Sequence, residues 1–280
     1  MIKRTLSTLV LFTGAILLLW QFGAIAGVAL ILFLAAASQH ELYRMLEACG
    51  FRPLRKTGIA LGVAYLLAAY LMPRFVPTAG AYHLGFDGMG LALVVIAAGS
   101  LLFSPPKARV GAIVSTSLGF LYIPFLLHFF IRIVDLVPGD ETTGLLLAFW
   151  VVVVVKSADI GAYLTGSLIG EHKLAPSISP GKTWEGALGG ILVCAGMAAA
   201  YALLFRDHFP MALGPAAAAL AAVIIGGVSI VSDLTESAFK RAANMKDSGN
   251  TIPGIGGAFD LTDSLLLAVP VAYGLLLLVV

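Results

Sequence analysis

The sequence predicts an all-α fold, a polytopic bundle of about nine transmembrane helices with a cytoplasmic N-terminus. Hydrophobic residues make up 60% of the 280 positions and charged residues only 11%, whereas soluble domains carry about 25% charged residues. The apolar residues also fall into runs of roughly 17 to 25 positions, which is the length that a helix needs to cross a bilayer. This composition excludes an ordinary soluble domain, and a formal net charge of +2 gives no support for a nucleic-acid partner.

Nine apolar stretches are the candidate spans. Only a short polar break at 21–23 separates the first two, so one long tilted helix is an alternative to two. A signal peptide fits the N-terminus poorly, because the apolar stretch is more than twice as long as the roughly 7 to 15 apolar residues of such a signal. The spans are expected at 5–20, 22–39, 57–73, 85–103, 110–128, 143–165, 184–205, 211–232 and 264–280.

The distribution of Lys and Arg predicts the orientation, because cytoplasmic loops carry an excess of these residues. With the N-terminus inside, 13 basic residues fall on inside segments and three on outside loops, while Lys156 lies within a span. The C-terminus is then outside. The two polar loops expected at 166–183 and 233–263 face the cytoplasm, where nucleotides are found.

We expect the chain to divide into scaffold helices over 1–140 and a membrane region over 141–280 that contains the candidate functional residues. The first part has apolar helices with short basic connections, and spacings such as Gly58 with Gly62 allow helices to approach closely in lipid. Cys49 and Cys194 are isolated, so neither a disulfide nor a zinc site is predicted.

Two ionisable residues lie inside the sixth expected span. Lys156 and Asp159 are three positions apart and share a helix face with Tyr163. Charges inside the bilayer are costly, so they are usually functional or paired. The two alternatives are a structural ion pair and the lining of a polar cavity.

The segment 170–186 combines basic residues with a predicted helix start. Ser179 before Pro180 is typical of an N-cap followed by proline at the first helical position, and the free amides of such a start can bind an anion. Lys173 and Lys182 add positive charge, and Gly186 with Gly190 gives the helix a close-packing face. An ordinary basic cytoplasmic loop would explain the lysines alone.

The segment 233–263 holds eight of the 32 charged residues. A helix beginning near Asp233 would carry one polar face, at the spacing i, i+3, i+4, i+7 and i+8. Taken alone, this face is also typical of a salt-bridged surface helix. Its members are Asp233, Glu236, Ser237, Lys240 and Arg241.

A glycine-rich loop and two further carboxylates follow. Gly254, Gly256 and Gly257 allow the backbone to approach a ligand, and Asp260 and Asp263 fall in the first turn of the last span. Carboxylate oxygens are ligands for Mg²⁺, which proteins hold through one or two carboxylates and substrate phosphates. We expect Asp233 and Asp260 to hold a metal ion between them, and the basic residues Lys240, Arg241 and Lys246 to contact phosphates.

A long motif in this region resembles the signature of the phosphatidate cytidylyltransferases, or CDP-diacylglycerol synthases. Upstream, 159–163, 173–186 and 233–237 also resemble that family, so the resemblance covers the C-terminal half, while the N-terminal half agrees only in hydropathy. The motif consists of Ser237, Lys240, Arg241, Lys246, Asp247, Gly249, Ile252, Pro253, Gly254, Gly256, Gly257, Asp260 and Asp263.

The resemblance implies transfer of CMP from CTP to phosphatidate, which releases pyrophosphate and leaves CDP-diacylglycerol. It also implies Mg²⁺, with K⁺ beside it, and a homodimer in a bacterial inner membrane with its active site facing the cytoplasm. The expected metal ligands are Asp233, Asp260 and Asp263. The expected catalytic residues are Lys240, Arg241, Lys246, Asp247, Lys182, Ser179 and Glu236, and the expected nucleotide contacts are Lys173, Gly254, Gly256, Gly257 and Ser237.

Two positions depart from the family pattern. Ile255 stands where His is usual, and Leu261 stands where Arg is usual. We interpret the chain as a divergent subgroup of the enzyme, in which the rate or the lipid acceptor differs. Two other functions stay open: a CTP-dependent kinase of a lipid alcohol, and an ion-coupled transporter lined by Lys156, Asp159 and Asp233.

Overall fold

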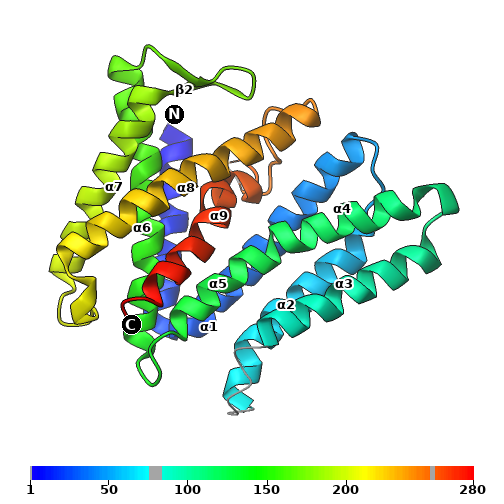
Figure 1. Ribbon diagram of the computed structural model, residues 1–280, viewed down its shortest axis with the longest axis horizontal. Helices are drawn as coiled ribbons and strands as arrows, with labels where there is room; N and C mark the ends of the chain where they lie inside the picture. The colour runs from blue at the N-terminus through cyan, green and yellow to red at the C-terminus, as the bar shows by residue number, and fades with distance from the viewer. Residues whose placement is uncertain (1, 76–83, 253–255) are drawn as a thin grey trace. The chain divides into compact units, whose positions relative to one another are not determined.

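Most of the described residues are helical in the computed structural model, which describes residues 2–75, 84–252 and 256–280 (Figure 1). The predicted all-α class is confirmed. In the part of the chain that the structure describes, two short 3-10 helices, Pro106–Ala108 and Met211–Leu213, accompany nine α-helices. These are α1 (Ile2–Ala48), α2 (Arg55–Phe75), α3 (Leu84–Phe103), α4 (Arg109–Tyr122), α5 (Pro124–Val134), α6 (Glu141–Ile169), α7 (Trp184–Leu204), α8 (Pro215–Ala242) and α9 (Ala258–Leu276).

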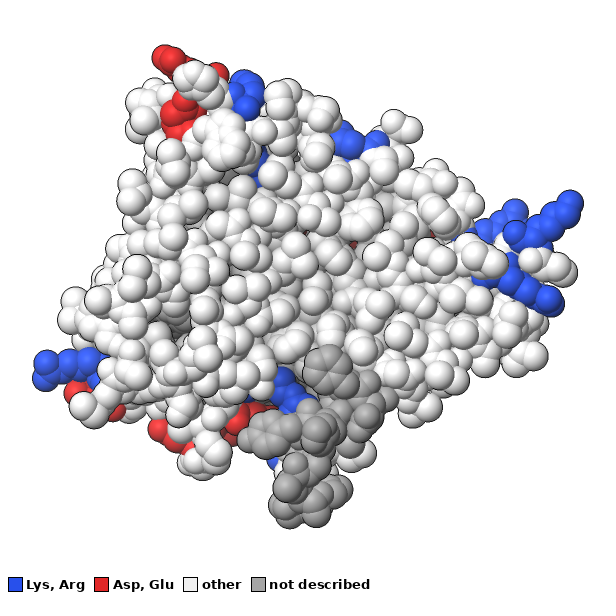
Figure 2. Space-filling view, in the orientation of Figure 1, with Lys and Arg blue, Asp and Glu red and all other residues white. Residues whose placement is uncertain are grey.

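Seven helical segments of the described residues are long and apolar enough to cross a membrane. By this criterion the chain is an integral membrane protein, and uncharged residues form most of the visible face in Figure 2. The expected number of nine spans is not confirmed, because α4 and α5 count as one segment and the apolar part of α3, Met89–Phe103, is shorter. The segments are Gln21–Ala48, Arg55–Phe75, Pro106–Val134, Glu141–Ile169, Trp184–Leu204, Pro215–Ala242 and Ala258–Leu276.

Helix α1 is interrupted near the polar break at 21–23, where the sequence was compatible with either one helix or two. Two helical segments meet at Gly23, whose φ of 56° and ψ of −137° are not helical, a conformation that glycine adopts at little steric cost. The second segment runs to Ala48, past the end expected at 39. The extension contains Glu41, whose side chain is buried.

The chain folds into two compact units. The first contains residues 1–131 and 239–262, and the second contains 132–238 and 263–280. Helices α8 and α9 each contribute residues to both units. The chain first passes from one unit to the other at 131–132, near the boundary expected at 140. Residues 239–262, however, belong to the unit of the N-terminal helices.

Tyr43 occupies the centre of the first unit and is fully buried. Its hydroxyl donates to the carbonyl oxygen of Thr116 at 2.9 Å and accepts from Nε2 of Gln39 at 3.0 Å. A Cβ added to Gly58 or Gly119 would overlap the Tyr43 side chain. The close approach predicted for Gly58 is therefore confirmed, and it brings α2 and α4 against α1.

The second unit has α6 packed along α7 (Figure 1). A Cβ added to Gly186 would lie 2.8 Å from the carbonyl oxygen of Ala162, and one added to Gly190 would lie 2.6 Å from that of Ala158. These distances leave room only for hydrogen. The predicted packing face of Gly186 and Gly190 is thus confirmed.

A β-hairpin joins α6 to α7, and it corrects the predicted helix start. Strands β1 (Lys173–Ala175) and β2 (Ser179–Thr183) pair antiparallel. Ser179 is therefore extended, and the N-cap of α7 is Thr183, whose Oγ1 accepts from the amide of Gly186 at 3.1 Å. The expectation that Ser179 caps the helix was wrong, because strand pairing keeps the chain extended as far as Thr183.

The two polar segments contain more helix than the loops expected at 166–183 and 233–263. Helix α6 continues to Ile169, α8 continues to Ala242, and α9 begins at Ala258. No helix begins near Asp233, which instead lies within α8. The reason is local: residues 228–241 contain neither Gly nor Pro, so nothing in the sequence interrupts the helix.

Candidate active site

Three carboxylates gather in the second unit. Asp233 and Glu236 lie one turn apart on α8, and Asp263 comes from α9; one oxygen of each lies within 4.8 Å of the others. Glu236 is fully buried. The spacing i, i+3 brings the two α8 side chains to one face, so the arrangement offers three oxygen ligands to a cation.

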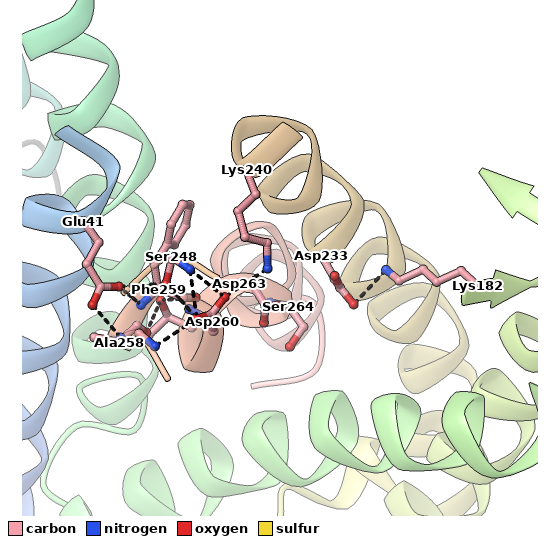
Figure 3. Close-up of polar contacts among 12 residues, drawn as sticks. Glu41, Lys182, Asp233, Lys240, Ser248, Ala258, Phe259, Asp260, Asp263 and Ser264 are labelled. Carbon is pink, nitrogen blue, oxygen red and sulfur yellow. Dashed lines mark hydrogen bonds and ion pairs between the residues drawn. The ribbon is translucent and has the colours of Figure 1, made fainter. Parts of the chain in front are cut away.

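Electrostatics favour a cation at this cluster. Two like charges about 5 Å apart repel by about 3 kcal/mol at an effective dielectric constant near 20. Part of this repulsion is relieved by Lys182, whose Nζ lies 2.7 Å from Oδ2 of Asp233 (Figure 3). Hard oxygen ligands are those that Mg²⁺ prefers, so the donor set fits a magnesium ion.

A second polar group in the same unit contains Lys156 and Asp159. The Lys156 Nζ lies 3.3 Å from Oδ2 of Asp159 and 2.9 Å from Oγ of Ser264, which in turn lies 2.9 Å from Asp159 Oδ2. Lys156 and Asp159 therefore form an ion pair. Since the two charged side chains are 31% and 34% exposed, the polar-lining alternative stays open.

In the first unit, Asp260 accepts hydrogen bonds from several directions (Figure 3). Its Oδ1 lies 3.0 Å from Nζ of Lys240, and its Oδ2 accepts from the amide of Gly257 at 2.9 Å and from the amide of Ser248 at 3.2 Å. Ser248 Oγ also lies 2.9 Å from Oδ2. These contacts hold the carboxylate in one orientation at the start of α9, where the sequence placed it.

Glu41 is a residue that the sequence argument missed. It lies in α1, is 1% exposed, and binds residues of the loop after α8 and the first turn of α9. One signal was present, because the polar run Ser38-Gln39-His40-Glu41 directly follows a long apolar stretch. A lone carboxylate at the end of a span indicates a partner elsewhere, although it does not name that partner.

Comparisons with known proteins agree with the motif. The family described as "Cytidylyltransferase family" matches residues 2–279. The chain belongs to this family. The resemblance noted in the sequence is confirmed, and it extends through the N-terminal half as well.

Several curated relatives of this family are similar to the chain. A protein of Synechocystis sp. named phosphatidate cytidylyltransferase is 31% identical over an alignment of 280 positions. The alignment covers 91% of this chain and 87% of the relative. Proteins with the same name align over shorter stretches. One from Pseudomonas aeruginosa is 45% identical over 133 residues, or 48% of this chain and 47% of its own, and one from Bacillus subtilis is 38% identical over 162 residues, or 58% and 57%.

The structure brings some of the expected site residues together within each unit. In the second unit, Asp233 lies with Glu236, Asp263 and Lys182; in the first, Asp260 lies with Lys240. A metal ion held jointly by Asp233 and Asp260 stays a prediction, because these residues belong to different units. In the structure, the carboxylates that lie beside Asp233 are those of Glu236 and Asp263.

The remaining expected residues have varied environments. Ser237 is buried, while Lys173, Arg241, Lys246 and Asp247 are exposed. Their expected contacts with nucleotide and phosphate stay predictions.

The glycine loop has its own internal bonds. Gly254 and Ile255 lie outside the described residues, whereas Gly256 has a φ of 132°, as a glycine permits. The amide of Gly256 donates to the carbonyl oxygen of Ile252 at 3.1 Å, and that of Gly257 donates to Asp260. Both amides therefore have partners within the protein. Gly256 and Gly257 thus have a structural role in addition to the expected contact with a ligand.

Proposed function

We propose that this chain transfers CMP from CTP to phosphatidate and produces CDP-diacylglycerol and pyrophosphate. The observation that carries the proposal is the cluster of Asp233, Glu236 and Asp263 beside Lys182, in a membrane protein of the cytidylyltransferase family. The names of the curated relatives support the same activity. We place the reaction at the cytoplasmic face of a bacterial inner membrane, in keeping with the distribution of basic residues.

Each group of the site has a proposed role. Asp233, Glu236 and Asp263 would hold Mg²⁺, and Asp260, in the first unit, is proposed as a further metal-binding carboxylate. When bound, Mg²⁺ neutralises phosphate oxygens and makes the phosphorus more electrophilic. We propose that Lys182 and Lys240, each paired with an aspartate in the structure, exchange that partner for a phosphate oxygen of the substrate.

The proposed step is a direct displacement. A phosphate oxygen of phosphatidate forms a bond to the α-phosphorus of CTP, and the bond from this phosphorus to the oxygen that bridges to the β-phosphate breaks. Pyrophosphate leaves with that electron pair. Such a transfer depends on positioning and charge neutralisation, so it requires no covalent intermediate on His or Cys.

Labelled CTP tests the proposal. Purified protein in detergent receives phosphatidate, a polyprenol, Mg²⁺ and CTP labelled at either the α- or the γ-phosphate, and lipids are separated by thin-layer chromatography. We expect the α-label in lipid and the γ-label in pyrophosphate. Transfer of the γ-label to a lipid alcohol would indicate a kinase, and label absent from all lipids would contradict both enzyme functions.

A homodimer and a K⁺ ion are further proposals, which rest on the family resemblance. Light scattering of the detergent-solubilised protein measures the mass of the assembly. Replacing K⁺ by Na⁺ in the assay tests whether the activity needs potassium.

A further inference from the structure

Glu41 connects the N-terminal helices to the motif region of the first unit. Its Oε1 accepts from Oγ1 of Thr251 at 2.5 Å and from the amide of Ala258 at 3.1 Å. Its Oε2 accepts from Oγ of Ser248 and from the amide of Phe259, both at 2.9 Å. The partners are 207 to 218 residues away in the sequence, so this carboxylate is a long-range contact of the fold.

The four donors match the acceptor capacity of a carboxylate. A buried carboxylate is costly unless its oxygens are hydrogen-bonded, and here each oxygen lies within hydrogen-bond distance of two donors. Two of the donors, the amides of Ala258 and Phe259, belong to the first turn of α9, where amides lack partners within the helix. Negative charge is favourable at such a helix start, so Glu41 stabilises the beginning of α9.

Glu41 also explains two glycines of the motif. A Cβ added to Gly249 would lie 2.5 Å from Oε1 and 2.9 Å from Cδ of Glu41. One added to Gly257 would overlap both Ser248 Oγ and Glu41 Oε2. The glycines at these two positions therefore make room for the carboxylate of α1.

Ser248 connects Glu41 to Asp260. Its Oγ lies 2.9 Å from Glu41 Oε2 and 2.9 Å from Asp260 Oδ2, and its single proton serves one carboxylate at a time. The amide of Ser248 donates to Asp260 as well. Any shift of Ser248 away from Glu41 therefore changes the bonds that orient Asp260.

We propose that Glu41 is a positioning residue of the active site: it holds Ser248, Thr251 and the first turn of α9, and through Ser248 it orients Asp260. The role deepens the proposed function and rests on it. Glu41 touches the groups that carry Asp260 and has no direct role in the reaction. Residues that orient ligands in this way typically change metal affinity or activity by about 10- to 100-fold when they are replaced.

Replacement by glutamine tests the role with little change of shape. In either orientation of Glu41→Gln, the new NH₂ group faces one backbone amide, because each carboxylate oxygen accepts one amide and one hydroxyl. We expect kcat to fall about tenfold and the Mg²⁺ concentration for half-maximal rate to rise, with the KM for phosphatidate unchanged. The matched control is Glu47→Gln, a partly exposed carboxylate of the same helix paired with Arg55 at 3.6 Å, which should leave all three values unchanged.

Hydrogen exchange provides a readout that does not depend on turnover. In Glu41→Gln, the amides of 256–262 should exchange at least about tenfold faster, while α2 and α6 exchange as in the wild type. Unchanged exchange and unchanged kcat would overturn the proposal. Equal acceleration in all helices would also overturn it, because Glu41 would then contribute only global stability.

A double-mutant cycle tests the contact with Gly249. All three of the nearest atoms to a Cβ at this position belong to Glu41, so Gly249→Ala should lower kcat in the wild type but cause no further loss in Glu41→Ala. Additive losses would contradict the contact. If the Glu41 variants do not fold, Thr251→Val removes one donor to Oε1, and it should give a smaller loss of the same kind; a wild-type kcat and Mg²⁺ dependence in Thr251→Val would overturn the proposal.

The two proposals fail separately. If the wild-type protein forms no CDP-lipid, the proposed function is wrong, and the exchange measurement still decides whether Glu41 holds the first turn of α9. If the wild type is active and Glu41→Gln has the same kcat, Mg²⁺ dependence and exchange, only the positioning role is wrong.

Discussion

The ammonium group of Lys182 lies 2.7 Å from Oδ2 of Asp233, so a lysine of the hairpin neutralises one of the three clustered carboxylates. The two side chains are 24% and 28% exposed. A cation bound by Asp233 would take over this neutralisation and release Lys182 toward substrate phosphates. This ion pair thus links strand β2 of the hairpin to the predicted metal site.

The first prediction concerns this pair. Lys182→Gln removes a positive charge that competes with the metal, so the apparent affinity for Mg²⁺ should rise several-fold, while loss of a phosphate contact should lower kcat at least about tenfold. A Mg²⁺ titration of the activity measures both effects. Lys107→Gln, which removes an exposed lysine in the first unit, is the control; weaker Mg²⁺ binding in Lys182→Gln would contradict the competition.

Neutralising the carboxylates tests the cluster itself. Asp233→Asn, Glu236→Gln and Asp263→Asn each remove a proposed ligand charge, so each should lower CDP-lipid formation by about 100-fold or more and weaken the binding of Mn²⁺ in electron paramagnetic resonance titrations. Asp207→Asn, an exposed carboxylate of the second unit, should behave as wild type. Wild-type activity in Asp233→Asn would exclude the metal site.

The network of Lys156, Asp159 and Ser264 should contribute stability. Ser264 is fully buried and contacts both charged side chains at 2.9 Å, so Ser264→Ala should destabilise the protein by about 1–3 kcal/mol. Thermal unfolding in detergent measures the loss. Ser167→Ala serves as the control, because Ser167 is exposed and its hydroxyl donates to the carbonyl oxygen of Leu164 in the same helix; equal unfolding temperatures for the two variants would show that the network adds nothing.

The position of the α7 N-cap gives a fourth prediction. Thr183→Ala removes the acceptor for the Gly186 amide and should lower stability by about 1 kcal/mol. Ser179→Ala, in the middle of the hairpin, should not change the unfolding temperature. The reverse result would restore the cap that the Ser-Pro pattern predicted.

The predicted helices agree with the structure wherever the pattern depends on neighbours in the sequence. Apolar runs located most of the helices, and the Gly186 and Gly190 spacing indicated their packing face. The error at Ser179 also arises from nearby residues. Ser179 followed by Pro180 has the composition of a helix start, but pairing of β1 with β2 gives those residues a different set of backbone partners.

The sequence predicted which residues carry the candidate site better than it predicted which of them lie together. Helical spacing placed Asp233 and Glu236 on one face, and the start of α9 placed Asp260 and Asp263 one turn apart. From the sequence, we expected Asp260 to share a metal ion with Asp233, and that joint site stays a prediction. In the structure, Asp263 lies with Asp233 in the second unit, while Asp260 bonds to Ser248 and Lys240 in the first.

By itself, the sequence determined the membrane class, most of the helices and the cytidylyltransferase motif, because hydropathy and short-range spacing are properties of neighbouring residues. Only the tertiary structure decided the role of Glu41, the use of Gly249 and Gly257, and the grouping of the carboxylates. The physical reason is distance along the chain: Glu41 and Phe259 are 218 residues apart. No local pattern relates such residues, and only the fold of the first unit brings the carboxylate of Glu41 to the free amides of Ala258 and Phe259.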